Sequence, residues 1–168
     1  MFKGIRQRLR DMGTIKALCK GAERHALRDG QAEPGAEHFL LSALELPDGS
    51  ARRSFERLKI DPAQLSAAIA RQHGEALRGI GLDPEPLAAL DTAPQPAAHG
   101  LYCASASGQA VMQGLAAGRG QPLLSAHVVA VIAGMRHGVA ARTLRALGLE
   151  PQALAASAAQ EIQASRFG

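Results

Sequence analysis

The chain has 168 residues, enough for one domain or for two small halves that share a core. Apolar residues make up 46% of the sequence but aromatic residues only 3%, so small and aliphatic side chains must fill that core. Alanine-rich segments with leucine at helical spacing favour closely packed helices. Most of the net charge of +4 lies in residues 1–13, with four basic residues and one acidic. Because the remainder lacks a basic stripe, we do not expect nucleic acid as a partner.

The two cysteines, Cys19 and Cys103, form neither a metal-ligand spacing nor a disulfide framework. Their simplest interpretation is as buried, reduced thiols in a reducing cytoplasm. The first residues lack the long apolar core of a signal peptide, and the most apolar run, residues 128–135, is too short to span a bilayer. We therefore expect a cytoplasmic protein without a membrane-spanning segment.

Apolar residues at three- and four-residue steps predict helices along most of the chain. In chain order, the predicted helices cover residues 1–12, 15–29, 37–46, 51–58, 62–72, 104–118, 126–136, 140–147 and 151–165. Residues 73–103 contain four prolines and four glycines and are predicted to form a partly ordered linker. The helix over residues 1–12 is amphipathic and basic. Docking on its own domain is its simplest role, and binding to a membrane surface or a partner is the less favoured alternative.

Polar residues mark several helix starts. Thr14, Ser50 and Ser125 are each placed as an N-cap. Asp61 combines an N-cap with a proline at the first helical position. The β-branched residues within 128–132 favour a strand locally. We nevertheless expect a helix there, because the repeat described next pairs this segment with a helical one.

An internal repeat relates the two halves of the chain. A constant shift of 89 residues aligns, without a gap, His38 with His127, Gly49 with Gly138, Ala51 with Ala140, Arg53 with Arg142, Leu58 with Leu147, Pro62 with Pro151 and Leu65 with Leu154. Such a repeat decides the architecture, and it predicts an all-α fold of two four-helix units with pseudo-twofold symmetry. The expected organisation is a basic leader (1–13), a first repeat (14–72), a linker (73–103) and a second repeat (104–168), with 14–168 as one domain.

These repeated segments resemble the N-terminal domain of the Clp family of AAA+ unfoldases. Each half of that domain carries a Gly-Thr-Glu-His-Leu-Leu-Leu-Gly-Leu-like segment, which residues 35–44 match as Gly-Ala-Glu-His-Phe-Leu-Leu-Ser-Ala-Leu. A Gly-x-Ala-x-x-x-Leu-x-x-Leu-Gly-Val-Asp-like segment follows, matched by residues 49–61 and 138–150. The resemblance covers most of 14–165. It implies a free-standing domain that binds a protein or peptide in protein quality control, the partner being an unfoldase, its adaptor or its clients.

The resemblance also implies a ligand site, since threonines and glutamates near the start of each half bind phosphorylated arginine in some family members. Carried over to this chain, the candidates are Glu37, its neighbour His38 and Thr14, which stands two residues from the family's position. In the second half Ala126 replaces the glutamate. The alternative is structural. In it, the negative charge of Glu37 stabilises the N-terminus of its own helix, and His38 and His127 each make a hydrogen bond at a helix start.

The sequence lacks the features of a catalyst. None of its four lysines follows a glycine, so there is no phosphate-binding loop, and the other histidines, His25, His73, His99 and His137, show no metal spacing. We therefore expect neither an enzyme nor a bound cofactor or metal. The alternatives from other classes are a small enzyme or small-molecule binder on a reused helical scaffold, and an interaction domain associated with a membrane or a secretion apparatus.

Overall fold

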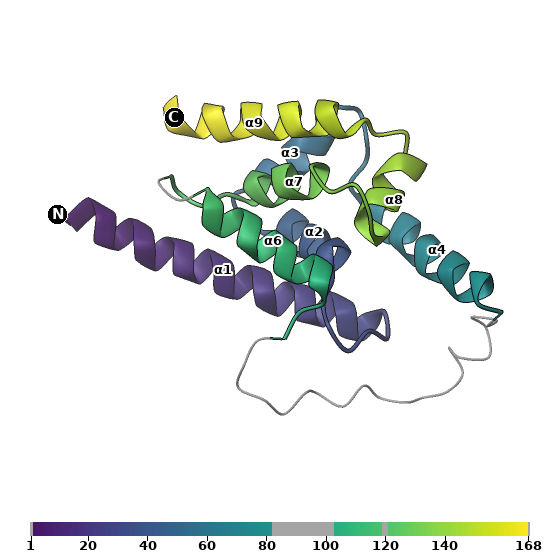
Figure 1. Cartoon of the computed structure of the whole chain (residues 1–168). Helices are drawn as coiled ribbons and strands as arrows, with labels where there is room; N and C mark the ends of the chain where they lie inside the picture. Colours follow the sequence, from purple (N-terminus) through teal and green to yellow (C-terminus); the bar gives the residue numbers. More distant parts are fainter. Residues whose placement is uncertain (1, 82–102, 119–120, 168) are drawn as a thin grey trace.

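The computed structural model describes residues 2–81, 103–118 and 121–167 (Figure 1). Within these ranges the chain is all-α, as predicted, with eight helices and no strand. The helices are α1 (Phe2–Arg28), α2 (Ala36–Glu45), α3 (Ser50–Glu56), α4 (Ala63–Gly79), α6 (Ala106–Ala117), α7 (Ser125–Ala133), α8 (Val139–Ala146) and α9 (Pro151–Phe167). None of them combines the length and the apolarity that crossing a bilayer requires.

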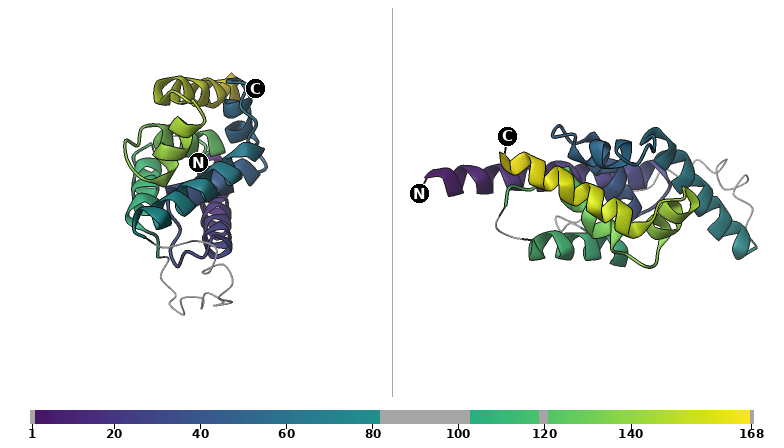
Figure 2. Two further views of the ribbon diagram at one scale, coloured as in Figure 1. Left: turned by 90° about the vertical axis from the view of Figure 1, so that its right-hand side faces the viewer. Right: turned by 90° about the horizontal axis from the view of Figure 1, so that it is seen from above.

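The short helices α2 and α7 form the centre of the bundle (Figures 1 and 2). They contact each other, and the longer helices α1 and α9 cover their outer sides. The core is aliphatic with two phenylalanines, and its largest fully buried side chains include Phe39, Phe55, Leu18, Leu40 and Leu65. At the crossing of α1 and α2 a Cβ on Gly21 would lie 2.2 Å from the Ser42 hydroxyl oxygen, so only glycine allows this close approach.

Helix α1 differs from the prediction of separate helices over residues 1–12 and 15–29. It runs without a break, and Thr14 lies inside it instead of capping a new helix. The reason is that Gly13 costs a helix only about 1 kcal/mol and neither residue removes a backbone donor. Helix α4 is likewise longer than predicted. It takes residues 73–79 from the expected linker, and residues 82–102 of that linker lie outside the described part of the chain.

Helix α4 begins at Ala63, one residue later than predicted, with Pro62 in the N-cap position, and the Asp61 carboxylate accepts a hydrogen bond from the Ala63 N–H (2.9 Å). Residues 128–132 are helical, as the repeat predicted. The side chains of Leu58 and Leu147 are both partly buried against the core. The burial predicted for the thiols is wrong for Cys103, which is exposed.

Ser50 and Ser125 do not cap their own helices, since each is the first residue of its helix. Instead, each caps the helix of the other half. The Ser50 hydroxyl accepts from the Ala126 N–H and the Ser125 hydroxyl accepts from the Ala51 N–H, both at 2.9 Å. Both hydroxyls also donate to the Asp48 carboxylate. This buried network joins α3 to α7 and holds the two halves of the chain together.

Candidate functional site

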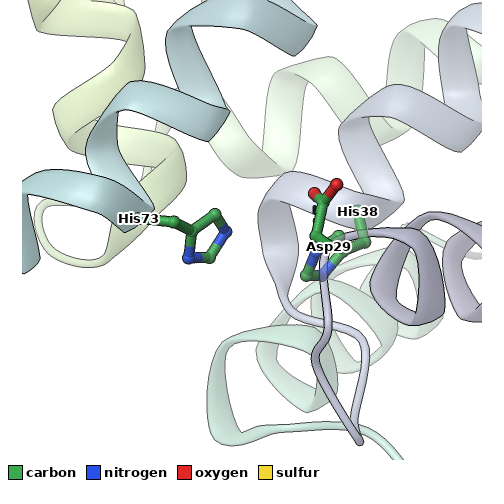
Figure 3. Close-up of side chains that lie close together, drawn as sticks. All are labelled: Asp29, His38 and His73. Carbon is green, nitrogen blue, oxygen red and sulfur yellow. Dashed lines mark ion pairs between the residues drawn. The ribbon is translucent and has the colours of Figure 1, made fainter. Parts of the chain in front are cut away.

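Four ionisable side chains come together where α1 ends, α2 begins and α4 passes. They are Asp29, Glu37, His38 and His73, and we call them the acid–histidine cluster. Figure 3 draws Asp29, His38 and His73. Figure 3 shows the His73 side chain extending from α4 toward Asp29 and His38. The segments that carry these residues are far apart in the sequence, so only the packing of three helices assembles the cluster.

The end of α1 places Asp29. Gly30 adopts a left-handed conformation with φ 69°, and the Gln31 N–H donates to the Ala26 carbonyl at 2.8 Å. This six-to-one hydrogen bond is a Schellman motif, in which glycine is favoured because it has no Cβ. Asp29 thus lies just after the last turn of α1 and faces the first turn of α2, where its carboxylate Oδ2 is 3.4 Å from His38 Nε2.

His38 is 1% exposed and acts as a cap. Its Nδ1 accepts a hydrogen bond from the Gly35 N–H at 2.9 Å, and His127 Nδ1 accepts from the Leu124 N–H at 3.1 Å in the same way. The predicted structural hydrogen bond at each helix start is therefore confirmed. A backbone N–H can only donate, so the proton of a neutral His38 ring must be on Nε2, which faces Asp29.

Three members of the cluster have the proximity of metal ligands. Each of the three residues Asp29, His38 and His73 offers one ligand atom, and these three atoms lie within 4.8 Å of one another. A histidine that binds a metal normally donates its other ring N–H to an acceptor. In His38 the other nitrogen accepts from Gly35, so Nε2 carries the proton and has no lone pair for a metal. Metal binding would therefore require the loss of the cap of α2, and the cluster as folded does not suit a metal ion.

Glu37 is the most enclosed acid of the cluster, with 6% of its surface exposed. Its carboxylate turns back over the start of its own helix, where a Cβ on Gly35 would lie 2.7–2.9 Å from the carboxylate atoms. Within the described residues its ion-pair contacts are His38 Nδ1 and His73 Nε2, each at 3.7 Å and beyond hydrogen-bond range. The helix dipole favours an anion there, but the carboxylate keeps unused acceptor capacity.

The two imidazole rings stack, with centroids 5.9 Å apart and an interplanar angle of 13°. In the described part of the chain, His38 Nε2 and His73 Nε2 are buried and have no well-oriented hydrogen-bond partner. An unsatisfied buried polar atom costs about 1–3 kcal/mol, so groups that hydrogen-bond to the cluster would be stabilised there. Asp29 and His73 have side chains that are 19% and 20% exposed, which makes the cluster reachable from solvent.

The charge of Asp29 is stabilised by its neighbours. Burial alone would raise the pKa of this carboxyl group. The contact with His38, whose Nε2 lies 3.4 Å from Asp29 Oδ2, and the positive charges of His38, Arg28 and His73 together outweigh burial, so that the pKa of Asp29 lies below its ordinary value. Asp29 is therefore an anion at neutral pH.

Sequence reasoning found Glu37 and His38 and missed Asp29 and His73. No local pattern could have revealed the two missed residues, because they meet His38 only through long-range packing. Thr14, the third candidate, lies 15 residues before Asp29, which is about 22 Å along the helix axis. The structure thus brings Glu37 and His38 together and leaves Thr14 outside the acid–histidine cluster.

Two hollows of the surface lie elsewhere. One of about 450 Å³ is lined by Glu33, Cys103, Ala104, Gln109, Met112 and Gln113. One of about 290 Å³ is lined by Ala133, Gly134, Met135, Arg136, Arg145, Pro151, Gln152 and Ala155. Both are open to solvent, and neither includes a member of the acid–histidine cluster.

No protein-family model matches the chain, and no curated protein matches it. The cluster is therefore the best basis for a functional proposal.

Proposed function

We propose that the chain is a protein- or peptide-binding module, similar to the N-domain of a Clp unfoldase. It would act as an adaptor or a substrate-recognition domain in protein quality control. The observation that carries the proposal is the enclosed Glu37 carboxylate, whose two histidine neighbours both lie beyond hydrogen-bond distance. A buried carboxylate of this kind is a site for a cationic group that donates hydrogen bonds.

The expected ligand is an arginine or phosphoarginine side chain of a client protein. A guanidinium presents two parallel N–H groups that match a carboxylate such as Glu37. Arg28 adds a cation beside the cluster: its side chain is 57% exposed, and its Nε lies 3.8 Å from Asp29 Oδ1. A phosphate group on the bound arginine would pair with Arg28. Phosphoarginine should therefore bind more tightly than arginine.

We further infer that the fold is a duplicated four-helix unit with pseudo-twofold symmetry. Helices α2 and α7 begin 89 residues apart, as do α3 and α8. The backbone supports this relation, because the matching pairs Gly49 and Gly138, and Lys59 and Gly148, all have positive φ. Lys59 is the one described non-glycine residue with positive φ, and its counterpart is a glycine.

Contacts between the halves are also reciprocal. Helix α3 packs against α9, and the matching helix α8 packs against α4. In the first of these pairs Arg53 Nε donates to Glu161 at 2.6 Å. In the second, Arg142 Nε lies 3.3 Å from the side-chain oxygen of Gln72. Arg142 lies 89 residues after Arg53, and Glu161 lies 89 residues after Gln72. The same contact therefore occurs in both helix pairs, with a neutral amide oxygen as the weaker acceptor in the second.

Calorimetric titration with phosphoarginine and with a short arginine-bearing peptide tests the binding site. Glu37→Gln should weaken binding at least tenfold, since a hydrogen bond to a charged group contributes about 1.5–3 kcal/mol. Glu33→Gln is the matched control, because Glu33 is an exposed acid four residues away and should leave the affinity unchanged. Absence of binding, two equivalent sites per chain, or equal affinities for wild type and Glu37→Gln would contradict the proposed site. Capture of an unfoldase subunit from lysate would support the adaptor role.

A further inference from the structure

The N-terminal half of α1 extends beyond the other helices, as the views in Figures 1 and 2 agree. It carries three of the most exposed large apolar side chains of the described residues: Ile5 is 56% exposed, Leu9 63% and Met12 65%. We call these three side chains the apolar stripe. Single exposed apolar residues are ordinary, but three at helical spacing on one projecting segment require an explanation.

The apolar stripe faces away from the body of the protein. Each residue of an α-helix turns by about 100°, and the fully buried Leu18 marks the side of α1 that packs on α2. Relative to Leu18, Leu9 lies about 180° around the helix, while Ile5 and Met12 lie about 140° and 120° around it. The sequence-based expectation that this segment docks its apolar side on its own domain is therefore wrong, because that side points to solvent.

Basic residues flank the apolar stripe. Arg6 and Arg8 lie on opposite sides of it by the same helical geometry, and both are exposed, as is Arg10. The acid of this segment, Asp11, accepts a hydrogen bond from the Leu123 N–H at 2.9 Å and so is held on the body side. The outward face is thus apolar at its centre and positive at its edges. Arginine stems are long enough to keep their charged ends level with lipid phosphates while the centre of the face is buried.

We propose that the N-terminal half of α1 binds the surface of an anionic lipid bilayer, with the apolar stripe inserted below the headgroups and the arginines on the phosphates. The charge pattern selects this occupant over a second copy of the chain, whose equally positive edges would repel the first. A stable dimer also needs about 800 Å² per partner, far more than three side chains bury. A basic amphipathic helix that lies in the interface is the known mode for such a pattern.

Vesicle co-sedimentation of the full chain, with any tag at the C-terminus, tests this proposal. The protein should bind phosphatidylcholine vesicles containing phosphatidylglycerol, bind pure phosphatidylcholine far less, and dissociate as salt rises. The double variant Arg6→Gln/Arg8→Gln should bind about 30-fold more weakly, at about 1 kcal/mol per charge. Arg71→Gln/Arg78→Gln removes two exposed charges elsewhere and should bind like wild type.

A second pair of variants tests the apolar stripe. The triple substitution of Ile5, Leu9 and Met12 by glutamine, which preserves helix propensity, should abolish sedimentation while the circular dichroism spectrum keeps its helical form. Leu27→Gln changes an exposed leucine on the same face of α1 outside the projecting half, and should retain binding. Equal binding to neutral vesicles, no binding to anionic vesicles, or wild-type binding by both N-terminal variants would overturn the proposal. If the chain instead forms a dimer that depends on the apolar stripe and does not bind vesicles, the stripe binds a second copy of the chain and the proposal is wrong.

Discussion

His38 and His127 make the same hydrogen bond at the starts of α2 and α7, in very different surroundings. Each accepts from the N–H of the residue three positions earlier, at 2.9 and 3.1 Å. His38 is preceded by the enclosed acid Glu37, whereas His127 is preceded by the fully buried Ala126. The capping role needs only the histidine, and both halves have it. Asp29, Glu37 and His73 surround His38, and for this reason we place the proposed ligand site in the first half.

The largest expected effect separates the two caps by stability. His38→Ala removes a cap and leaves a cavity beside two enclosed carboxylates, so we expect a loss of about 3 kcal/mol in the free energy of unfolding. His127→Ala should cost about 1 kcal/mol, the usual value of a lost cap, because His127 is only partly buried. Urea denaturation measures both, with the exposed His137→Ala as a control near zero. Equal losses at His38 and His127 would contradict the claim that His38 contributes more to stability than its cap alone.

Gly35 and Glu37 should be coupled. Gly35 has φ −96° and ψ 178°, which any residue adopts, so the demand for glycine comes from the carboxylate that fills the space of its Cβ. In a double-mutant cycle, Gly35→Ala and Glu37→Ala should show a coupling free energy of about 1 kcal/mol. Additive losses would mean that the carboxylate does not occupy this position in solution.

An equally modest backbone effect tests the duplication. Lys59 has φ 58° and its counterpart Gly148 has φ 71°. Gly148→Ala should lower the free energy of unfolding by about 1 kcal/mol, because a Cβ is disfavoured in the left-handed region. Lys59→Gly should be neutral or stabilise by less than about 1 kcal/mol, since relief of strain opposes the added chain entropy. Thermal unfolding of both variants is sufficient, and a strongly destabilised Lys59→Gly would contradict the equivalence of the two turns.

The contribution of Asp29, in the first half, to the free energy of unfolding should depend on pH. The pKa of Asp29 is lowered in the folded protein, since the close contact with His38 and the nearby positive charges outweigh burial. Its ionised form therefore stabilises the fold above the unfolded pKa of about 4, and this contribution is lost as the pH falls through the folded pKa. Asp29→Asn should be less stable than wild type at pH 6, with the difference shrinking in acid. A constant difference from pH 6 to pH 2 would rule out the proposed charge interaction.

Much of the fold could be predicted because its signals are local. Gly30 and Asp61 mark helix boundaries that the structure confirms, and apolar periodicity located the helices. The errors occurred where tertiary packing overrides local preference. Gly13 and Thr14 look like a break, but α1 continues through them, and Ser50 and Ser125 cap each other's helices across the two halves.

The candidate site was predictable only in part. Glu37 and His38 are adjacent in a recognisable segment, so sequence reasoning could single them out. His73 lies 35 residues after His38, and Asp29 precedes Gly30 in a helix-ending turn with no pattern of its own. Neither residue carries a local signal for a cluster, and their meeting depends on how α1, α2 and α4 pack.

The backbone amides of Gly35 and Leu124 offer the most direct test of the claim that ligand binding belongs to the first half alone. Each amide donates to a histidine Nδ1 at the start of α2 or α7, so each reports on one half. In ¹H–¹⁵N spectra titrated with phosphoarginine, we expect the Gly35 resonance to shift with saturation and the Leu124 resonance to stay in place. Glu37→Gln should remove the Gly35 shift. Parallel shifts at both amides, or none at Gly35 in the wild-type protein, would contradict the account.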